Sequence, residues 1–139
     1  MASIKREAFI DARPETVWSA LRDVGALHTR LVPGFVTHCT LEGEARAVTF
    51  ANGMQAMERI VDVNEKFRRV SWSAVGGRLT HHNASAQVIP IGKESCKVIW
   101  IADLLPHELA PAIAEMIEQG LEAMKRFQES QNAASHVKR

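Results

Sequence analysis

The longest periodic stretch of apolar positions in this chain runs from Glu108 to Gln128. Within it, apolar residues recur at every third or fourth position and charged residues fall largely on the other side, as in an amphipathic helix. The apolar members are Leu109, Ile113, Met116, Ile117, Gly120, Leu121, Met124 and Phe127. At about 1.5 Å per residue, this helix spans roughly 30 Å. The pattern predicts one long helix whose apolar face needs a surface to cover.

The beginning of the chain combines one strand with two short helical segments. Residues Ser3 to Asp11 alternate between apolar and polar side chains, which predicts a strand. Pro14 begins a short helix with the sequence PETVWSALRD, and Asp23 with Gly25 ends it. We expect a second helical turn over Ala26 to Leu31.

From Gly34 onward, turn residues divide the chain into runs of strand length. Regular spacing with short turns predicts an antiparallel meander. The expected strands are Phe35 to Leu41, Ala45 to Phe50, Gln55 to Val61, Arg69 to Val75, His81 to Ile89 and Cys96 to Leu104. We interpret residues 1–129 as a single domain and residues 130–139 as a loose polar tail.

The predicted order is one strand, two short helices, six strands and one long helix, which indicates an α+β fold. A strongly curved antiparallel sheet of about seven strands has one face to cover, and the long helix is apolar enough to cover it. Side chains from a concave sheet cannot all reach a cylinder of about 10 Å diameter. We therefore expect a cavity between sheet and helix, and an apolar cavity is by default a ligand site.

Four segments of the sequence together show a resemblance to a known protein family. They are PETVWSALRD, RAVTFANG, ERIVDVNEKFRRVSWSAVGGRLTHHNASAQV and VIWIADLLP. In these segments the chain resembles the START-like (SRPBCC) superfamily, in its polyketide cyclase/dehydrase branch, over nearly its whole length. The resemblance implies the helix-grip fold, in which a curved sheet wraps round a C-terminal helix. It implies less about function, because this fold hosts lipid carriers, hormone receptors, aromatase/cyclases and chaperone activators.

The middle segment is also similar to that of the plant abscisic-acid receptors, whose pocket lies under two loops and the long helix. By this resemblance, ANGM at 51–54 corresponds to a gate loop and GGRLTHH at 76–82 to the loop that faces it. The resemblance implies a pocket carboxylate at Glu58 and pocket-facing side chains at Val48, Phe50, Trp72, Ala74, His82 and Ala84. The facing loop is shorter here, histidine replaces the common pocket tyrosine, and the frequent tryptophan before the proline is absent at Leu31-Val32-Pro33. Hormone recognition is not carried over.

Glu58 and His82 are the candidate acid–base residues. Strand parity places Glu58 on a face that it shares with Met54 and other apolar residues. This carboxylate is either a polar anchor or general acid/base with a pKa raised by desolvation, or the partner of Arg46 in a structural ion pair. His82 either hydrogen-bonds a ligand or is satisfied within the protein.

Composition and charge narrow the range of partners. The formal net charge is +1, with no basic run and no tyrosine, which argues against a nucleic-acid partner. No signal-peptide pattern is present and no apolar run approaches the roughly 20 residues of a membrane span, so we expect a cytoplasmic protein without stable membrane insertion. Cys39 and Cys96 fit no metal or redox spacing, and the adjacent His81 and His82 point to opposite faces of a strand. We expect no metal, no cofactor, and a monomer or homodimer.

The favoured hypothesis is a protein that binds a small apolar or amphiphilic molecule, lipid-like, polyketide-like or hormone-like, between sheet and helix. Its predicted ligand-binding residues are Arg46, Val48, Phe50, Met54, Glu58, Trp72, Ala74, His82, Ala84, Ala112, Met116 and Gly120. The alternative is a polyketide cyclase/dehydrase-type enzyme in which Glu58 or His82 moves protons. A third hypothesis has a vestigial cavity and a surface recruited for a protein partner.

Overall fold

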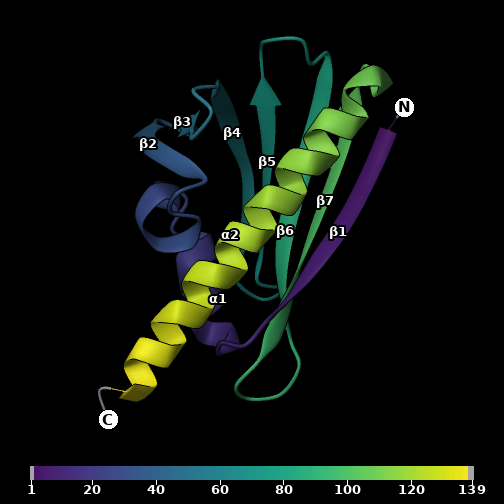
Figure 1. Ribbon diagram of the computed structural model, residues 1–139. Coiled ribbons are helices and arrows are strands. Elements are labelled where there is room, and N and C mark those ends of the chain that lie inside the picture. The colour runs from purple at the N-terminus through teal and green to yellow at the C-terminus, as the bar shows by residue number, and fades with distance from the viewer. Residues whose placement is uncertain (1, 138–139) are drawn as a thin grey trace.

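The computed structural model describes residues 2–137, which form one antiparallel sheet with a long helix crossing one of its faces (Figure 1). In chain order the elements are β1 Ala2–Ile10, α1 Pro14–Arg22, η1 Leu27–Leu31, β2 Val36–Glu42, β3 Ala45–Phe50, β4 Gln55–Asn64, β5 Arg69–Val75, β6 His81–Pro90, β7 Cys96–Leu105, η2 His107–Leu109 and α2 Ala110–Val137. The strand order is β1-β7-β6-β5-β4-β3-β2. This confirms the predicted α+β order and the seven-stranded sheet around a long helix.

The sheet curves round α2 with the help of two irregular ladders. The register shifts between Val36 and His38 where β2 pairs with β3, and between Ile60 and Asp62 where β4 pairs with β5. A bulge of this kind bends its strand and increases the local twist. In Figure 1, β2, β3 and β4 lie on one side of α2 and β1 lies on the other.

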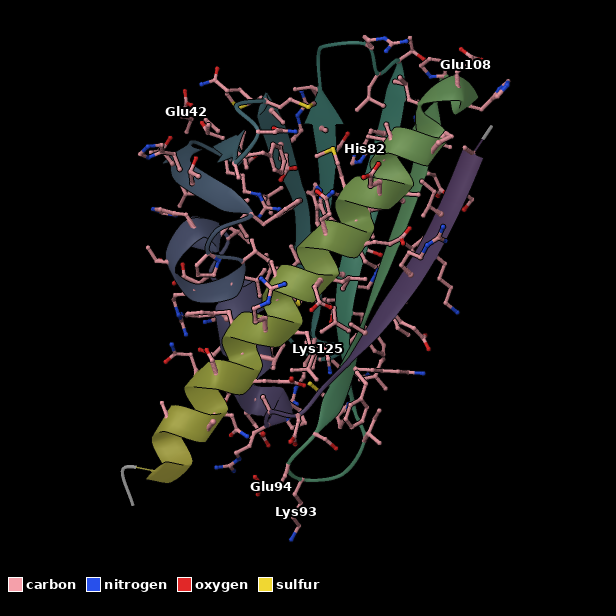
Figure 2. All side chains as sticks on the ribbon, viewed as in Figure 1. Glu42, His82, Lys93, Glu94, Glu108 and Lys125 are labelled. Carbon is pink, nitrogen blue, oxygen red and sulfur yellow. The ribbon has the colours of Figure 1, made fainter. Side chains whose placement is uncertain are left out.

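Strands β5 and β6 separate toward one end. Their ladder reaches only the pair Trp72 and Ala84, whereas β6 goes on pairing with β7 as far as His81 and Leu105. The last residues of β5 thus have no strand partner on the β6 side within residues 2–137. Figure 2 shows His82 in this part of the sheet.

Helix α2 is attached to the edge strand β1 and the residues that follow it. Lys125 Nζ donates a hydrogen bond to the carbonyl oxygen of Phe9 at 2.7 Å. Glu129 Oε2 accepts one from the backbone N–H of Asp11 at 2.9 Å, and Asn132 Nδ2 donates to the carbonyl oxygen of Asp11 at 3.0 Å. The backbone of α2 approaches β1 over much of its length but hardly approaches the middle strands. Space between α2 and the middle of the sheet must be filled by side chains or left open.

The long helix extends beyond its predicted end. It continues through Val137, so the prediction of a loose tail is wrong for residues 130–137, while Lys138 and Arg139 lie outside the described residues. The segment contains no glycine or proline that would end a helix. Gln128 also donates a hydrogen bond from Nε2 to the carbonyl oxygen of Arg30 at 2.7 Å, which ties this part of α2 to η1. Within residues 2–137, no helix combines the length and hydropathy needed to cross a membrane.

Gly120 lies where α2 packs closely on the Trp100 ring. A Cβ atom at this position would lie 2.8 Å from Cζ3 of Trp100 and 3.2 Å from Cε2 of Phe35. Gly120 was among the predicted ligand-binding residues. The structure shows instead a close approach of the helix to strand β7, because the Trp100 ring already occupies the space beside Gly120.

We expect Gly120→Leu to lower the free energy of unfolding by about 2 kcal/mol, because the added side chain must displace the Trp100 ring. Urea unfolding followed by circular dichroism measures this. Gln119→Leu is the control, since Gln119 is the exposed neighbour on the same helix and its substitution should change stability by less than about 0.5 kcal/mol. Equal stabilities of the two variants would contradict the close packing.

Candidate ligand-binding site

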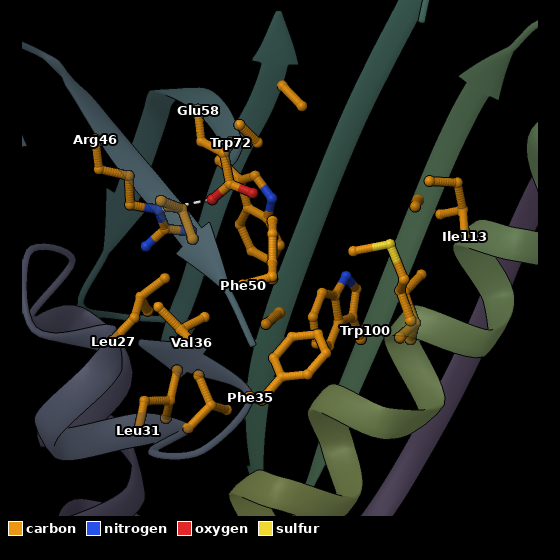
Figure 3. A pocket seen from close by; sticks show the side chains of 18 of the residues that line it. Leu27, Leu31, Phe35, Val36, Arg46, Phe50, Glu58, Trp72, Trp100 and Ile113 are labelled. Atoms are coloured by element: carbon orange, nitrogen blue, oxygen red, sulfur yellow. Dashed lines mark hydrogen bonds and ion pairs between the residues drawn. The ribbon is translucent and has the colours of Figure 1, made fainter. Parts of the chain in front are cut away.

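A cavity of about 160 Å³ lies between the concave face of the sheet, η1 and α2 (Figure 3). Its lining is almost entirely apolar. Figure 3 shows Arg46 and Glu58 at one end, Trp100 and Ile113 toward α2, and Phe50 between them. The enclosed volume is smaller than the few hundred Å³ of a common ligand site. It suffices for a small group and not for a whole lipid.

An open depression of about 740 Å³ adjoins this cavity beside the first turns of α2. The two share seven lining residues, which come from strands β3 to β5, the β5–β6 loop and α2. These are Val48, Met54 of the β3–β4 loop, Ala56, Ala74, Leu79, Ile113 and Met116. Because the same side chains line both spaces, the cavity and the depression adjoin at these residues. We refer to the two spaces as the inner cavity and the outer depression.

The structure brings most of the sequence-predicted site residues together. Those that line the inner cavity are Arg46, Val48, Phe50, Met54, Glu58, Trp72, Ala74, His82 and Met116. Ala112 is exposed and lines the outer depression. Ala84 is buried in the sheet at 2% exposure and Gly120 packs against Trp100, so neither belongs to the lining.

Several lining residues were not among those predicted from the sequence. They include Leu27 and Leu31 of η1, Phe35, Trp100 and Met124. Leu27 and Leu31 are four positions apart and so share a helical face, which is a signal the sequence contained. Strand parity also points Trp100 to the concave face, since it is two residues from Ala102. What the sequence did not indicate is which apolar side chains border empty space and which pack solidly.

Glu58 and Arg46 form a buried ion pair at one end of the inner cavity. They stand opposite each other on β4 and β3, with exposures of 9% and 3%. Arg46 Nε donates to Glu58 Oε1 at 2.8 Å, and Arg46 Nη1 donates to the carbonyl oxygen of Val24 at 3.2 Å. The guanidinium also lies over the Trp72 ring, 5.3 Å from its centroid. The sequence left two interpretations of Glu58 open, and the structure shows the ion pair within the lining of the cavity.

Trp72 and Trp100 form an edge-to-face pair along the cavity, with ring centroids 5.6 Å apart. Of the three indole N–H groups, only that of Trp18 donates a hydrogen bond within the described residues, to Glu65 at 2.8 Å. The indole nitrogens of Trp72 and Trp100 are therefore donors without a partner in the lining. A buried indole N–H group usually donates a hydrogen bond. Since these two have no acceptor in the lining, they can donate to a polar atom of a ligand.

His82 lies between the inner cavity and a second, more polar depression on the other side of the sheet. Its Nδ1 accepts a hydrogen bond from the backbone N–H of Ala74 at 2.9 Å, and its own carbonyl oxygen accepts one from Ser73 Oγ at 2.6 Å. These bonds replace the ladder where β5 and β6 separate. Desolvation by burial, and secondly the charge of the adjacent His81, lower the pKa of His82. The neutral ring with its proton on Nε2 fits both observations.

Neither cysteine offers a nucleophile to the cavity. Both thiols are free and buried, and burial raises the pKa of each, that of Cys96 to about 11. A thiol of such a pKa is protonated at neutral pH, and the thiolate is the reactive form. The described residues therefore give no support to covalent catalysis through cysteine.

The sequence profile of the family described as polyketide cyclase / dehydrase and lipid transport matches residues 1–129. The chain belongs to this family. No curated protein matches the chain at a significant level.

Solved structures share the fold. An uncharacterised protein from Bacillus thuringiensis is similar with a TM-score of 0.82 at 18% identity, covering 91% of this chain and 98% of that one. A START superfamily protein from Mycobacterium smegmatis gives 0.71 at 14% identity, with 95% and 97% covered. Norcoclaurine synthase from Thalictrum flavum, in complex with dopamine and hydroxybenzaldehyde, gives 0.67 at 19% identity, with 91% and 85% covered. The resemblance to the START-like superfamily and its helix-grip fold is thereby confirmed.

We expect Arg46→Met to lower the free energy of unfolding by about 3 kcal/mol, because it leaves the Glu58 carboxylate buried without its partner. The double variant Arg46→Met/Glu58→Met should recover most of this loss. Chemical denaturation of both variants measures the coupling. Arg126→Met is the control, since its ion pair with Glu122 is exposed and should contribute less than about 1 kcal/mol. A double variant no more stable than the single one would contradict the coupling.

We expect acid to weaken the fold through His82. Its pKa in the folded protein is below the usual 6.5, so the unfolded chain binds the proton more readily. The stabilisation is complete above about pH 6.5 and is lost as the pH falls toward the folded pKa. In His82→Asn the amide oxygen can still accept from Ala74 but does not titrate, so unfolding curves below pH 6.5 should show a smaller loss of stability than wild type. His81→Asn, altered on the exposed face, should retain most of the loss, and an unchanged profile in His82→Asn would contradict the assignment.

Proposed function

We propose that this protein binds a small apolar or amphiphilic molecule in the inner cavity, with the remainder of the molecule in the outer depression. The observation that carries the proposal is the apolar inner cavity, with the outer depression adjoining it beside α2. Burial of apolar surface contributes about 25 cal/mol per Å², so even a ring-sized group gains appreciable free energy on entering such a space. A ligand whose polar group reaches the Arg46 and Glu58 end of the cavity would form hydrogen bonds there that the apolar walls cannot form.

The opening is lined by side chains that can adapt to a ligand. Met54, Met116 and Leu79 line both spaces, and Met54 is more than half exposed. Methionine has several rotatable bonds and a polarisable sulfur, which suits surfaces that accept varied apolar groups. These residues favour entry between the β5–β6 loop and the start of α2.

Binding without chemistry is favoured over a cyclase/dehydrase-type enzyme by the state of the two acid–base candidates. Glu58 is held by Arg46, and the Nδ1 atom of His82 is held by Ala74. A general base needs a free acceptor within about 3 Å of the proton that it removes. The observation in favour of catalysis is the second oxygen of Glu58, which has no hydrogen bond from the described residues.

We expect Ala74→Phe to reduce the affinity for the neutral fluorescent probe N-phenyl-1-naphthylamine at least tenfold, about 1.4 kcal/mol, because the phenyl ring fills the passage between the two spaces. Fluorescence titration measures the affinity. Ala133→Phe, at an exposed position near the end of α2, is the control and should bind as wild type. If wild type binds no probe, or if Ala74→Phe binds as well as the control, the proposed site is contradicted.

Turnover distinguishes the enzyme from the carrier. With the molecule extracted from the purified protein and identified by mass spectrometry, wild type, Glu58→Gln and His82→Asn are incubated with it and the products are examined. A carrier returns the molecule unchanged in every case. Conversion by wild type that is lost in either variant, with binding retained, would establish the enzyme instead.

A further inference from the structure

We propose that the inner cavity selects a neutral ring that bears a hydroxyl group, an alcohol or a phenol, over an anionic amphiphile such as a carboxylic acid. This selectivity rests on the proposed function, because it concerns the ligand of the same cavity. Three properties of the inner cavity account for this selectivity. They are the charge at its Arg46 and Glu58 end, which we call the buried end, the size of the cavity, and its free hydrogen-bonding atoms.

The charges at the buried end cancel. Arg46 and Glu58 are the charged side chains of the described lining, and their side chains are only 4% and 11% exposed. Arg46 already donates to Glu58 and to the carbonyl oxygen of Val24. A ligand carboxylate placed here would lie beside the Glu58 carboxylate and would have to compete for a guanidinium that is already paired. Since burying an unpaired charge costs several kcal/mol, the anion is excluded from this end.

The size of the inner cavity matches one small ring system. Its volume is about 160 Å³. A buried apolar cavity of about 150 Å³ in another protein stays dry and binds benzene. The walls here include Phe35, Phe50 and the edge-to-face pair Trp72 and Trp100, which offer ring faces and edges to a flat group. A ring therefore fits where a branched or folded chain does not.

The free polar atoms of the cavity are of both kinds. Glu58 Oε2 is an acceptor, and the indole N–H groups of Trp72, beside Glu58, and of Trp100, toward α2, are donors, none of them bonded within the described residues. In Figure 3 the carboxylate of Glu58 and the indole of Trp72 lie close together at the end of the cavity. A hydroxyl group donates one hydrogen bond and accepts others, so it can satisfy both kinds at once. A carboxylate or a carbonyl oxygen can only accept and leaves Glu58 Oε2 unmatched.

The outer depression does not reverse this selectivity. Its charged lining residue among those described is Arg78, which is exposed on the β5–β6 loop. An anionic group that reaches Arg78 stays in contact with water, where an ion pair contributes little. The preference for a neutral group therefore belongs to the buried end.

Three compounds of similar size test the selectivity: naphthalene, 2-naphthol and 2-naphthoate. The chain contains three tryptophans, so a ¹H–¹⁵N spectrum shows three indole signals, assigned by single Trp→Phe variants. Those of Trp72 and Trp100 should shift on binding, and that of Trp18, bonded to Glu65 outside the cavity, is the internal reference. We expect 2-naphthol to bind at least tenfold more tightly than 2-naphthoate and more tightly than naphthalene.

The outcomes separate this selectivity from the proposed function. If 2-naphthoate binds as tightly as 2-naphthol, the charge selectivity is wrong and the cavity remains a binding site. If naphthalene binds as tightly as 2-naphthol, the hydroxyl group does not contribute to the affinity and this part of the proposal is wrong. If none of the three compounds shifts the signals of Trp72 and Trp100, the proposed function itself is contradicted.

The variant Glu58→Gln tests the cause of the selectivity. It leaves the Arg46 guanidinium without its carboxylate, so the affinity ratio of 2-naphthoate to 2-naphthol should rise at least tenfold. Glu44→Gln, at an exposed residue in the β2–β3 turn, removes the same charge from the chain and should leave the ratio unchanged. An unchanged ratio in a folded Glu58→Gln protein overturns the assignment to the ion pair, and the wild-type measurements decide the question if this variant does not fold.

Discussion

The attachment of α2 to the edge strand β1 is the constraint on which the rest of the structure depends. Hydrogen bonds donated by Lys125 and Asn132, and one accepted by Glu129, hold the helix against the chain around Phe9 and Asp11. A helix held at one edge of a curved sheet cannot also touch the strands that curve up on the opposite side. The remaining distance is only partly bridged by side chains, because small residues line the middle of the sheet. The cavity is thus a result of where the helix is fastened, and not of any one missing side chain.

The charged side chains of the described cavity lining lie together at one end. Arg46 and Glu58 face each other across the β3–β4 ladder, so their ion pair also fixes the register of two strands that would otherwise present similar alternating faces. A buried ion pair seldom adds net stability compared with apolar residues of the same shape. Its position in the cavity wall gives a reason for its presence, because it supplies orientation to a ligand while adding no net charge.

The fold could be predicted from the sequence because it depends on periodicities, with alternation in the strands and the three-to-four spacing of α2. Strand parity also identified the inward residues of β3 to β5. The remaining features depend on tertiary contacts that a linear pattern does not contain. Trp100 was not among the residues predicted to bind the ligand, and only the offset of α2 leaves space beside it. Gly120 was expected at a cavity, and only the position of Trp100 shows that this space is filled.

His82 gives the wall of the cavity a property that a continuous sheet lacks. Where β5 and β6 part, one side chain spans the gap that backbone pairing closes elsewhere, and spaces lie on both sides of it. The distance between β5 and β6 at this point is therefore set by the side chain of residue 82 and not by backbone hydrogen bonds. A substitution of His82 can therefore enlarge or narrow the cavity without a change in the β5–β6 hairpin. Ligands of different sizes can in this way be accommodated within one unchanged fold.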